Sequence, residues 1–288
     1  HDWAIYGPFS SLNDKQEVAI SQDGQKEAME HAGRTGGLPF VGVGWYRTEF
    51  DVPQFQAGKR ATILFDGAMS HANVYINGQK VGYWPYGYNS FHFDITKYLK
   101  PGEKNTLAVR LENLPESSRW YPGAGLYRNV HLIITEDAYI PVWGTYITTP
   151  SVNEKFAKVN VRTKVVLPEG ADPAKYSVET SVWNPNKQKL TAVRTSLAQM
   201  KYNNNQAEQE FVIQAPSLWS PEMPALYSAE TRLYEGDKLK DIYTTPFGIR
   251  SIEIIPDKGF FLNGKRTVFK GVCNHHDLGP LGGIANEA

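Results

Sequence analysis

The chain has 288 residues, 41% hydrophobic and 21% charged, a composition typical of a soluble globular protein, and its length predicts two compact units. The 30 Lys and Arg residues balance the 30 Asp and Glu residues, which disfavours nucleic acid or a membrane as a partner, and no apolar run approaches the roughly 20 residues of a membrane helix. The single cysteine, Cys273, excludes an internal disulfide and a four-cysteine zinc site.

The first half of the chain shows the period-two pattern of half-buried β-strands. Residues 15–32 contain Gly24 and lack a continuous apolar face, so we expect an irregular loop there with at most a turn of helix. Hydrophobic and polar residues then alternate in three segments, 74–76, 107–111 and 130–134. The pair Asn77-Gly78 predicts a tight hairpin turn after the first of them.

A boundary is predicted between residues 138 and 143, where Pro141 interrupts the pattern. Beyond it we expect seven short strands, at 145–148, 157–167, 176–183, 190–197, 209–214, 227–234 and 239–249. Seven strands in about a hundred residues are typical of an immunoglobulin-like sandwich. A hairpin at Asn263-Gly264 and one further strand at 267–273 are predicted after them.

Several motifs, in order along the chain, point to one enzyme family. They are Gly44-Trp45-Tyr46-Arg47, residues 118–130 (SRWYPGAGLYRNV), Leu218-Trp219-Ser220-Pro221, residues 247–250 (FGIR) and residues 271–277 (GVCNHHD). With these motifs the chain resembles glycoside hydrolase family 2, the group of β-galactosidases, β-glucuronidases and β-mannosidases. The resemblance implies an all-β chain: a jelly-roll sugar-binding-type domain at 1–139, an immunoglobulin-like β-sandwich at 140–250, and at 251–288 a hairpin and the first strand of a (β/α)8 barrel.

In that family the barrel carries the chemistry. A barrel needs about 250 residues, whereas 288 − 250 leaves 38 after Arg250. Retaining glycosidases use two carboxylates about 5 to 5.5 Å apart, and the resemblance puts both on later barrel strands. We therefore expect the non-catalytic portion of a longer β-galactosidase-like enzyme, cut at both ends, with no catalytic residue and no cofactor. Glu287 follows an asparagine, as the family's acid/base glutamate does, but a frayed terminus would not position it.

The resemblance also implies that Asn274, His275, His276 and Asp277 line a sugar pocket and bind substrate hydroxyls. Strand alternation would put His275 and Asp277 on one side and His276 on the other. For each of them, pairing within a barrel rim is an equal alternative. A zinc site is disfavoured, because two adjacent histidines and one aspartate leave the ligand shell incomplete.

Two groups of residues in the first half are further candidates for sugar contact. Arg119 and Trp120 lie in a loop that the resemblance directs toward the active-site face, where a ring stacks on a pyranose and an arginine binds hydroxyls; the alternative is that Trp120 and Tyr127 fill a core. A second set, Trp84, Tyr86 and Tyr88, lies in the densest aromatic cluster of the chain. These three rings suit a carbohydrate platform, or a sheet edge or domain contact, and we favour the structural alternative.

Three classes of function follow from these features. The first is part of an enzyme that hydrolyses terminal β-linked sugars with retention, with a β-linked glycan as partner and homo-oligomerisation left open. A periplasmic or secreted location suits that family better than the cytoplasm. The others are a self-standing carbohydrate-binding module, for which Trp84→Ala or Trp120→Ala would abolish glycan binding, and a structural or adhesive sandwich protein.

Overall fold

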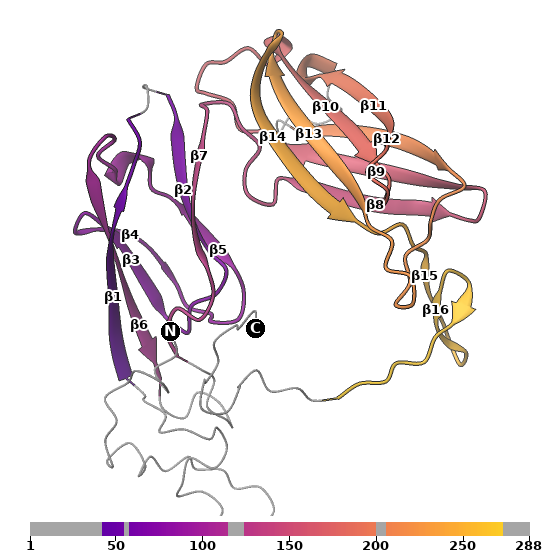
Figure 1. The fold of residues 1–288 in the computed structure, drawn as a ribbon, viewed down its shortest axis with the longest axis horizontal. Coiled ribbons are helices and arrows are strands. Elements are labelled where there is room, and N and C mark those ends of the chain that lie inside the picture. The colour runs from indigo at the N-terminus through magenta and orange to yellow at the C-terminus, as the bar shows by residue number, and fades with distance from the viewer. Residues whose placement is uncertain (1–41, 55–57, 115–123, 200–205, 273–288) are drawn as a thin grey trace, which may run out of the picture. The chain divides into compact units, whose positions relative to one another are not determined.

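The computed structural model describes residues 42–54, 58–114, 124–199 and 206–272, which fall into two compact units on either side of Ile134 and Thr135 (Figure 1). Strands dominate the described part of both units, and the helices found there are single turns of 3-10 type. None of the helices in these ranges is long and apolar enough to cross a bilayer. The segment 15–32, predicted as an irregular loop, lies outside the described residues.

The described residues of the first unit form two sheets that share one core. Their strand orders are β1-β6-β3-β4 and β5-β2-β7. The elements are β1 (Gly42–Asp51), β2 (Arg60–Phe65), β3 (Ala72–Ile76), β4 (Gln79–Trp84), β5 (Phe91–Asp94), η2 (Thr96–Tyr98), β6 (Lys104–Asn113) and β7 (Val130–Thr135). All three segments predicted from alternation are confirmed as strands, in β3, β6 and β7.

The core of the first unit follows directly from that alternation. Val109 and Leu111 of β6 are fully buried, and they meet Phe65 and Phe91 of the opposite sheet in one hydrophobic cluster. The rings of Phe65 and Phe91 stack with their centroids 4.8 Å apart. Burial of one face of each sheet leaves the other face of β1-β6-β3-β4 to polar and aromatic side chains.

Most of the second unit is a sandwich, to which its described residues contribute seven strands. The sheets have the orders β11-β10-β13-β14 and β12-β9-β8. The elements are β8 (Thr145–Val152), β9 (Phe156–Lys164), η3 (Pro173–Lys175), β10 (Tyr176–Trp183), β11 (Lys189–Ser196), η4 (Leu197–Gln199), β12 (Gln206–Gln214), β13 (Tyr227–Glu235) and β14 (Lys238–Phe247). Each of these seven strands, β8 to β14, corresponds to one predicted strand, so the all-β, immunoglobulin-like prediction is confirmed.

A small three-stranded sheet follows the second sandwich, made of β15 (Ile252–Ile255), β16 (Gly259–Leu262) and β17 (Lys265–Arg266). The predicted turns are confirmed, because Asn263 and Gly264 have φ values of 52° and 75°, and Asn77 and Gly78 have 51° and 80°. These left-handed pairs are typical of two-residue hairpins. The strand predicted at 267–273 is wrong for residues 267–272, which form none, because the described residues offer them no parallel neighbour with which to pair.

Candidate functional site

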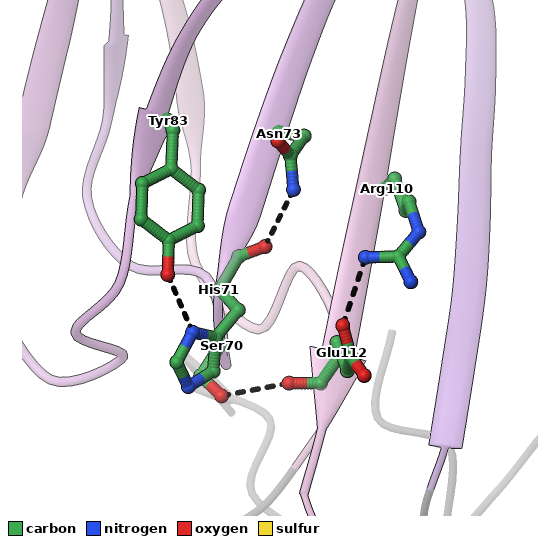
Figure 2. Close-up of polar contacts among 6 residues, drawn as sticks. All are labelled: Ser70, His71, Asn73, Tyr83, Arg110 and Glu112. Carbon is green, nitrogen blue, oxygen red and sulfur yellow. Dashed lines mark hydrogen bonds and ion pairs between the residues drawn. The ribbon is translucent and has the colours of Figure 1, made fainter.

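Polar and aromatic side chains gather at one end of the outer face of sheet β1-β6-β3-β4 (Figure 2). The six residues, called here the sheet-end cluster, are Ser70, His71, Asn73, Tyr83, Arg110 and Glu112. Strand alternation explains why they meet. Ala72 and Val74 are buried on either side of Asn73, as Val109 and Leu111 are around Arg110, so Asn73 and Arg110 project away from the core.

His71 is held at the start of β3 by three contacts. Its φ of 47° is left-handed, which is uncommon for a residue other than glycine. Its backbone N–H donates to the Pro85 carbonyl at 3.1 Å, and its carbonyl accepts a hydrogen bond from Asn73 Nδ2 at 3.2 Å. Its ring Nδ1 and the Tyr83 hydroxyl share a hydrogen bond of 2.6 Å (Figure 2). The imidazole is therefore fixed beside the Tyr83 ring.

Arg110 and Glu112 form an ion pair on the same face of β6, with Nη1 and Oε2 2.9 Å apart. Ser70 fixes the end of the strand, because its Oγ donates to the Glu112 carbonyl and its own carbonyl accepts the Glu112 N–H, both at 2.9 Å. A partly exposed pair of this kind adds little to stability. Its consequence is chemical: the cluster is polar and locally neutral.

The aromatic residues predicted as a patch separate into two environments. Trp84 is partly buried against the core, where its ring stacks on Phe91 at 5.6 Å and its indole N–H donates to Asn89 Oδ1 at 3.0 Å. Tyr86 and Tyr88 are exposed, with ring centroids 5.6 Å apart in an edge-on arrangement. Trp84 therefore has a packing role, and the two tyrosines supply the exposed rings.

Tyr127 is a core residue, as the structural alternative predicted. Its side chain is buried, its hydroxyl donates to the Gly87 carbonyl at 2.6 Å, and burial raises the pKa of that hydroxyl. A Cβ added at Gly67 would lie 2.7 Å from the Tyr127 oxygen. The ring thus anchors the loop that carries Tyr86 and Tyr88.

Replacing Tyr127 by phenylalanine is expected to lower the free energy of unfolding of the first unit by about 1 kcal/mol. The substitution keeps the ring but leaves the Gly87 carbonyl without its 2.6 Å donor. Urea unfolding monitored by fluorescence measures the change. An unchanged midpoint would contradict the anchoring role of the hydroxyl.

The other predicted site residues lie outside the described residues. They are Arg119, Trp120, Asn274, His275, His276 and Asp277. Glu287, which we did not expect to be catalytic, lies outside the described residues as well. The sheet-end cluster, in contrast, was not predicted from the sequence, where the histidines showed no ligand spacing. The available signal was the set of polar residues that alternate with buried ones in β3 and β6.

The second unit begins with a segment tied to β14 by side chains. Four contacts follow one another along both segments: Asp137 with Lys240, Ile140 with Asp241, Trp143 with Tyr243 and Thr145 with Thr245. The Lys240 ammonium lies 2.7 Å from Asp137, and this hydrogen bond lowers the pKa of the Asp137 carboxyl.

Of Asp137 and Asp241, only Asp241 has a raised pKa, because its carboxyl is partly buried. Its two oxygens accept the backbone N–H groups of Ile140 and Ile242, both at 2.8 Å. A raised pKa is a property of catalytic acids, but here the carboxyl is occupied by backbone donors. Across the described ranges, no group of three or more His, Cys, Asp or Glu side chains is arranged to hold a metal ion.

Comparison with known proteins agrees with this architecture. Residues 38–136 match the family model described as "Glycosyl hydrolases family 2, sugar binding domain", and residues 139–250 match "Glycosyl hydrolases family 2". The chain is 40% identical over 287 residues to the β-galactosidase BoGH2A of Bacteroides ovatus, covering 99% of this chain and 32% of that protein. It is 34% identical over 254 residues to a β-glucuronidase of Bacteroides fragilis, and this match covers 84% of this chain and 33% of that protein.

Solved structures give the same result. A glycosyl hydrolase family 2 member from Bacteroides cellulosilyticus superposes with a TM-score of 0.82 at 34% identity, covering 99% of this chain and 35% of that one. A β-glycosidase from Bacteroides vulgatus superposes with a TM-score of 0.78 at 30% identity, and the match covers 99% of this chain and 34% of that one. The chain thus spans about a third of the length of these relatives.

A sandwich matched by the sugar-binding-domain model is followed by an immunoglobulin-like sandwich matched by the second model of the same family, and this domain pair defines the class of protein to which the chain belongs. The chain belongs to glycoside hydrolase family 2, which confirms the resemblance of its motifs.

Proposed function

We propose that the chain is the sugar-binding and immunoglobulin-like part of a longer retaining β-glycosidase, of β-galactosidase type, that removes terminal β-linked sugars. The observation that supports this most is the match over almost the whole chain, at 40% identity, to a β-galactosidase three times as long. In this proposal the part described here carries no catalytic residue and needs no cofactor.

The surroundings of Asp241 and Asp137 support a non-catalytic role for these two carboxyls. A retaining glycosidase needs one carboxylate as nucleophile and another as acid and base, both open to the substrate. Asp241 has the raised pKa of an acid, but backbone N–H groups occupy both of its oxygens. Asp137 is paired with Lys240, which favours its ionised form.

The assignments made from the motifs remain part of this proposal. The domains would be 1–139, 140–250 and 251–288, and the sugar contacts would be Asn274, His275, His276, Asp277, Arg119 and Trp120. A β-linked glycan is the substrate in the longer protein, its location is periplasmic or secreted, and homo-oligomerisation is open to test.

The experiment compares this chain with the longer protein that contains it, using p-nitrophenyl β-galactoside and p-nitrophenyl β-glucuronide. We expect the longer protein to hydrolyse the galactoside with retention, seen by NMR as release of the β-anomer first, and this chain to show no turnover. Turnover by this chain, abolished by substitution of one of its own carboxylates, would contradict the proposal.

A further inference from the structure

A row of side chains crosses the outer face of the first unit's larger sheet. In the strand register Trp45 of β1 lies opposite Arg110 of β6, Arg110 lies opposite Asn73 of β3, and Asn73 lies opposite Tyr83 of β4. Neighbouring strands are about 4.8 Å apart, so the row extends over about 14 Å. It includes three members of the sheet-end cluster and adds Trp45.

Aromatic rings stand at both ends of the row. Trp45 is 57% exposed and Tyr83 is 45% exposed, although rings of this size are usually mostly buried. The ring of Trp45 also lies 5.6 Å from that of Tyr75, tilted by 35°. Tyr75 is opposite Ala108, whose small side chain leaves room for the two rings to meet above β6. The face therefore offers solvent the Trp45 ring, backed by Tyr75, at one end of the row and the Tyr83 ring at the other.

The groups between the rings have hydrogen-bonding capacity that the described residues leave unused. Within the described ranges, the Trp45 indole N–H, the Tyr75 hydroxyl and Asn73 Oδ1 have no polar partner. Arg110 donates from Nη1 to Glu112, and its other guanidinium N–H groups can donate to a ligand. One face thus combines ring surfaces with several unpaired donors and acceptors.

The absence of a net charge on the Arg110–Glu112 pair favours an uncharged ligand over a charged one. Because Glu112 neutralises Arg110 at 2.9 Å, the centre of the row gives no advantage to a phosphate or to a strongly charged peptide. A protein partner would favour a continuous apolar patch, whereas here ring faces alternate with amide and guanidinium groups. A sugar chain fits this pattern, since each pyranose has an apolar face for a ring and hydroxyls for the polar groups.

We propose that the outer face of β1-β6-β3-β4 binds a neutral β-linked oligosaccharide laid across the four strands. The Trp45 ring stacks on one sugar, and Asn73 and Arg110 bind its neighbours' hydroxyls. The choice of a β-linked sugar rests on the proposed function. The choice of this face rests on its side chains, and it lies within residues 38–136, which match a sugar-binding domain.

The test is calorimetric titration of the whole chain with two probes, β-1,4-linked galactotetraose and cellotetraose. We expect saturable binding of at least one of them, with affinity in the millimolar range or tighter. Replacement of Trp45 by alanine should weaken that binding at least tenfold, or about 1.4 kcal/mol. Because Trp45 is 57% exposed and loses only its contact with Tyr75, the variant should unfold cooperatively with a midpoint close to that of wild type, and Trp45→Phe should retain part of the affinity.

A matched control is available in the second unit. Trp143 is 56% exposed, and Trp143→Ala should bind both probes as the wild type does. The proposal is overturned if neither probe binds saturably, or if Trp45→Ala binds as well as Trp143→Ala. No hydrolysis is measured, so a negative result here is distinct from failure of the glycosidase assay.

Discussion

Replacing Phe65 by alanine is expected to lower the free energy of unfolding of the first unit by about 3–5 kcal/mol. Phe65 is fully buried, stacks on Phe91 and belongs to the cluster to which both sheets contribute. Its loss removes the transfer free energy of the ring and leaves a cavity that the rigid sheets fill only in part. This is a large share of the 5–15 kcal/mol by which a domain is typically stable.

Scanning calorimetry of the whole chain measures the effect. Because the two units have separate hydrophobic clusters, we expect two transitions, and Phe65→Ala should lower only the one that belongs to the first unit. Leu233→Ala is the matched control: Leu233 is fully buried in the second unit, and its loss should cost that unit about 2–5 kcal/mol. If either substitution moved both transitions equally, the units would unfold as one.

Replacing Asp241 by alanine is expected to cost the second unit about 1–3 kcal/mol, because the Ile140 N–H loses its acceptor in a partly buried position. The Ile242 N–H loses its acceptor as well, at a more exposed site. Urea unfolding at neutral pH measures the loss. Glu154→Ala, at an exposed carboxyl of the same unit for which no hydrogen bond is found within the described residues, should leave the unfolding curve unchanged.

The pH dependence at Asp241 has a definite sign. Burial raises the pKa of this carboxyl in the folded chain, so folding favours its protonated form, and the cost of ionising it begins above its ordinary pKa of about 3.9. Asp241→Asn avoids that cost at every pH. The stability of the asparagine variant relative to wild type should therefore improve between about pH 4 and neutrality, and a constant difference would contradict the burial argument.

The strands could be predicted because each buries one face. Alternation at 159–165, for example, is enough to identify β9, whose Val159 and Val161 are fully buried. The sheet-end cluster could not be predicted in the same way. Arg110 meets Asn73 and Trp45 only because β6 lies between β3 and β1, and a single sequence does not fix this strand order. The position of His71 depends in addition on a left-handed backbone and on its Tyr83 partner.

The contacts between residues 137–145 and β14 determine at which residue the first sandwich can be exchanged for that of a relative without loss of stability. A gene fusion that exchanges the first sandwich and joins after Tyr139 would keep Lys240 but replace Asp137, its partner at 2.7 Å. The Lys240 side chain is only 6% exposed, and without Asp137 its ammonium group keeps only the more distant Glu235, at 3.6 Å, so losing the closer, hydrogen-bonded carboxylate in such a site is costly. A junction before Glu136 keeps all four contacts within one parent. We therefore expect chimaeras joined there to be more stable than chimaeras joined a few residues later.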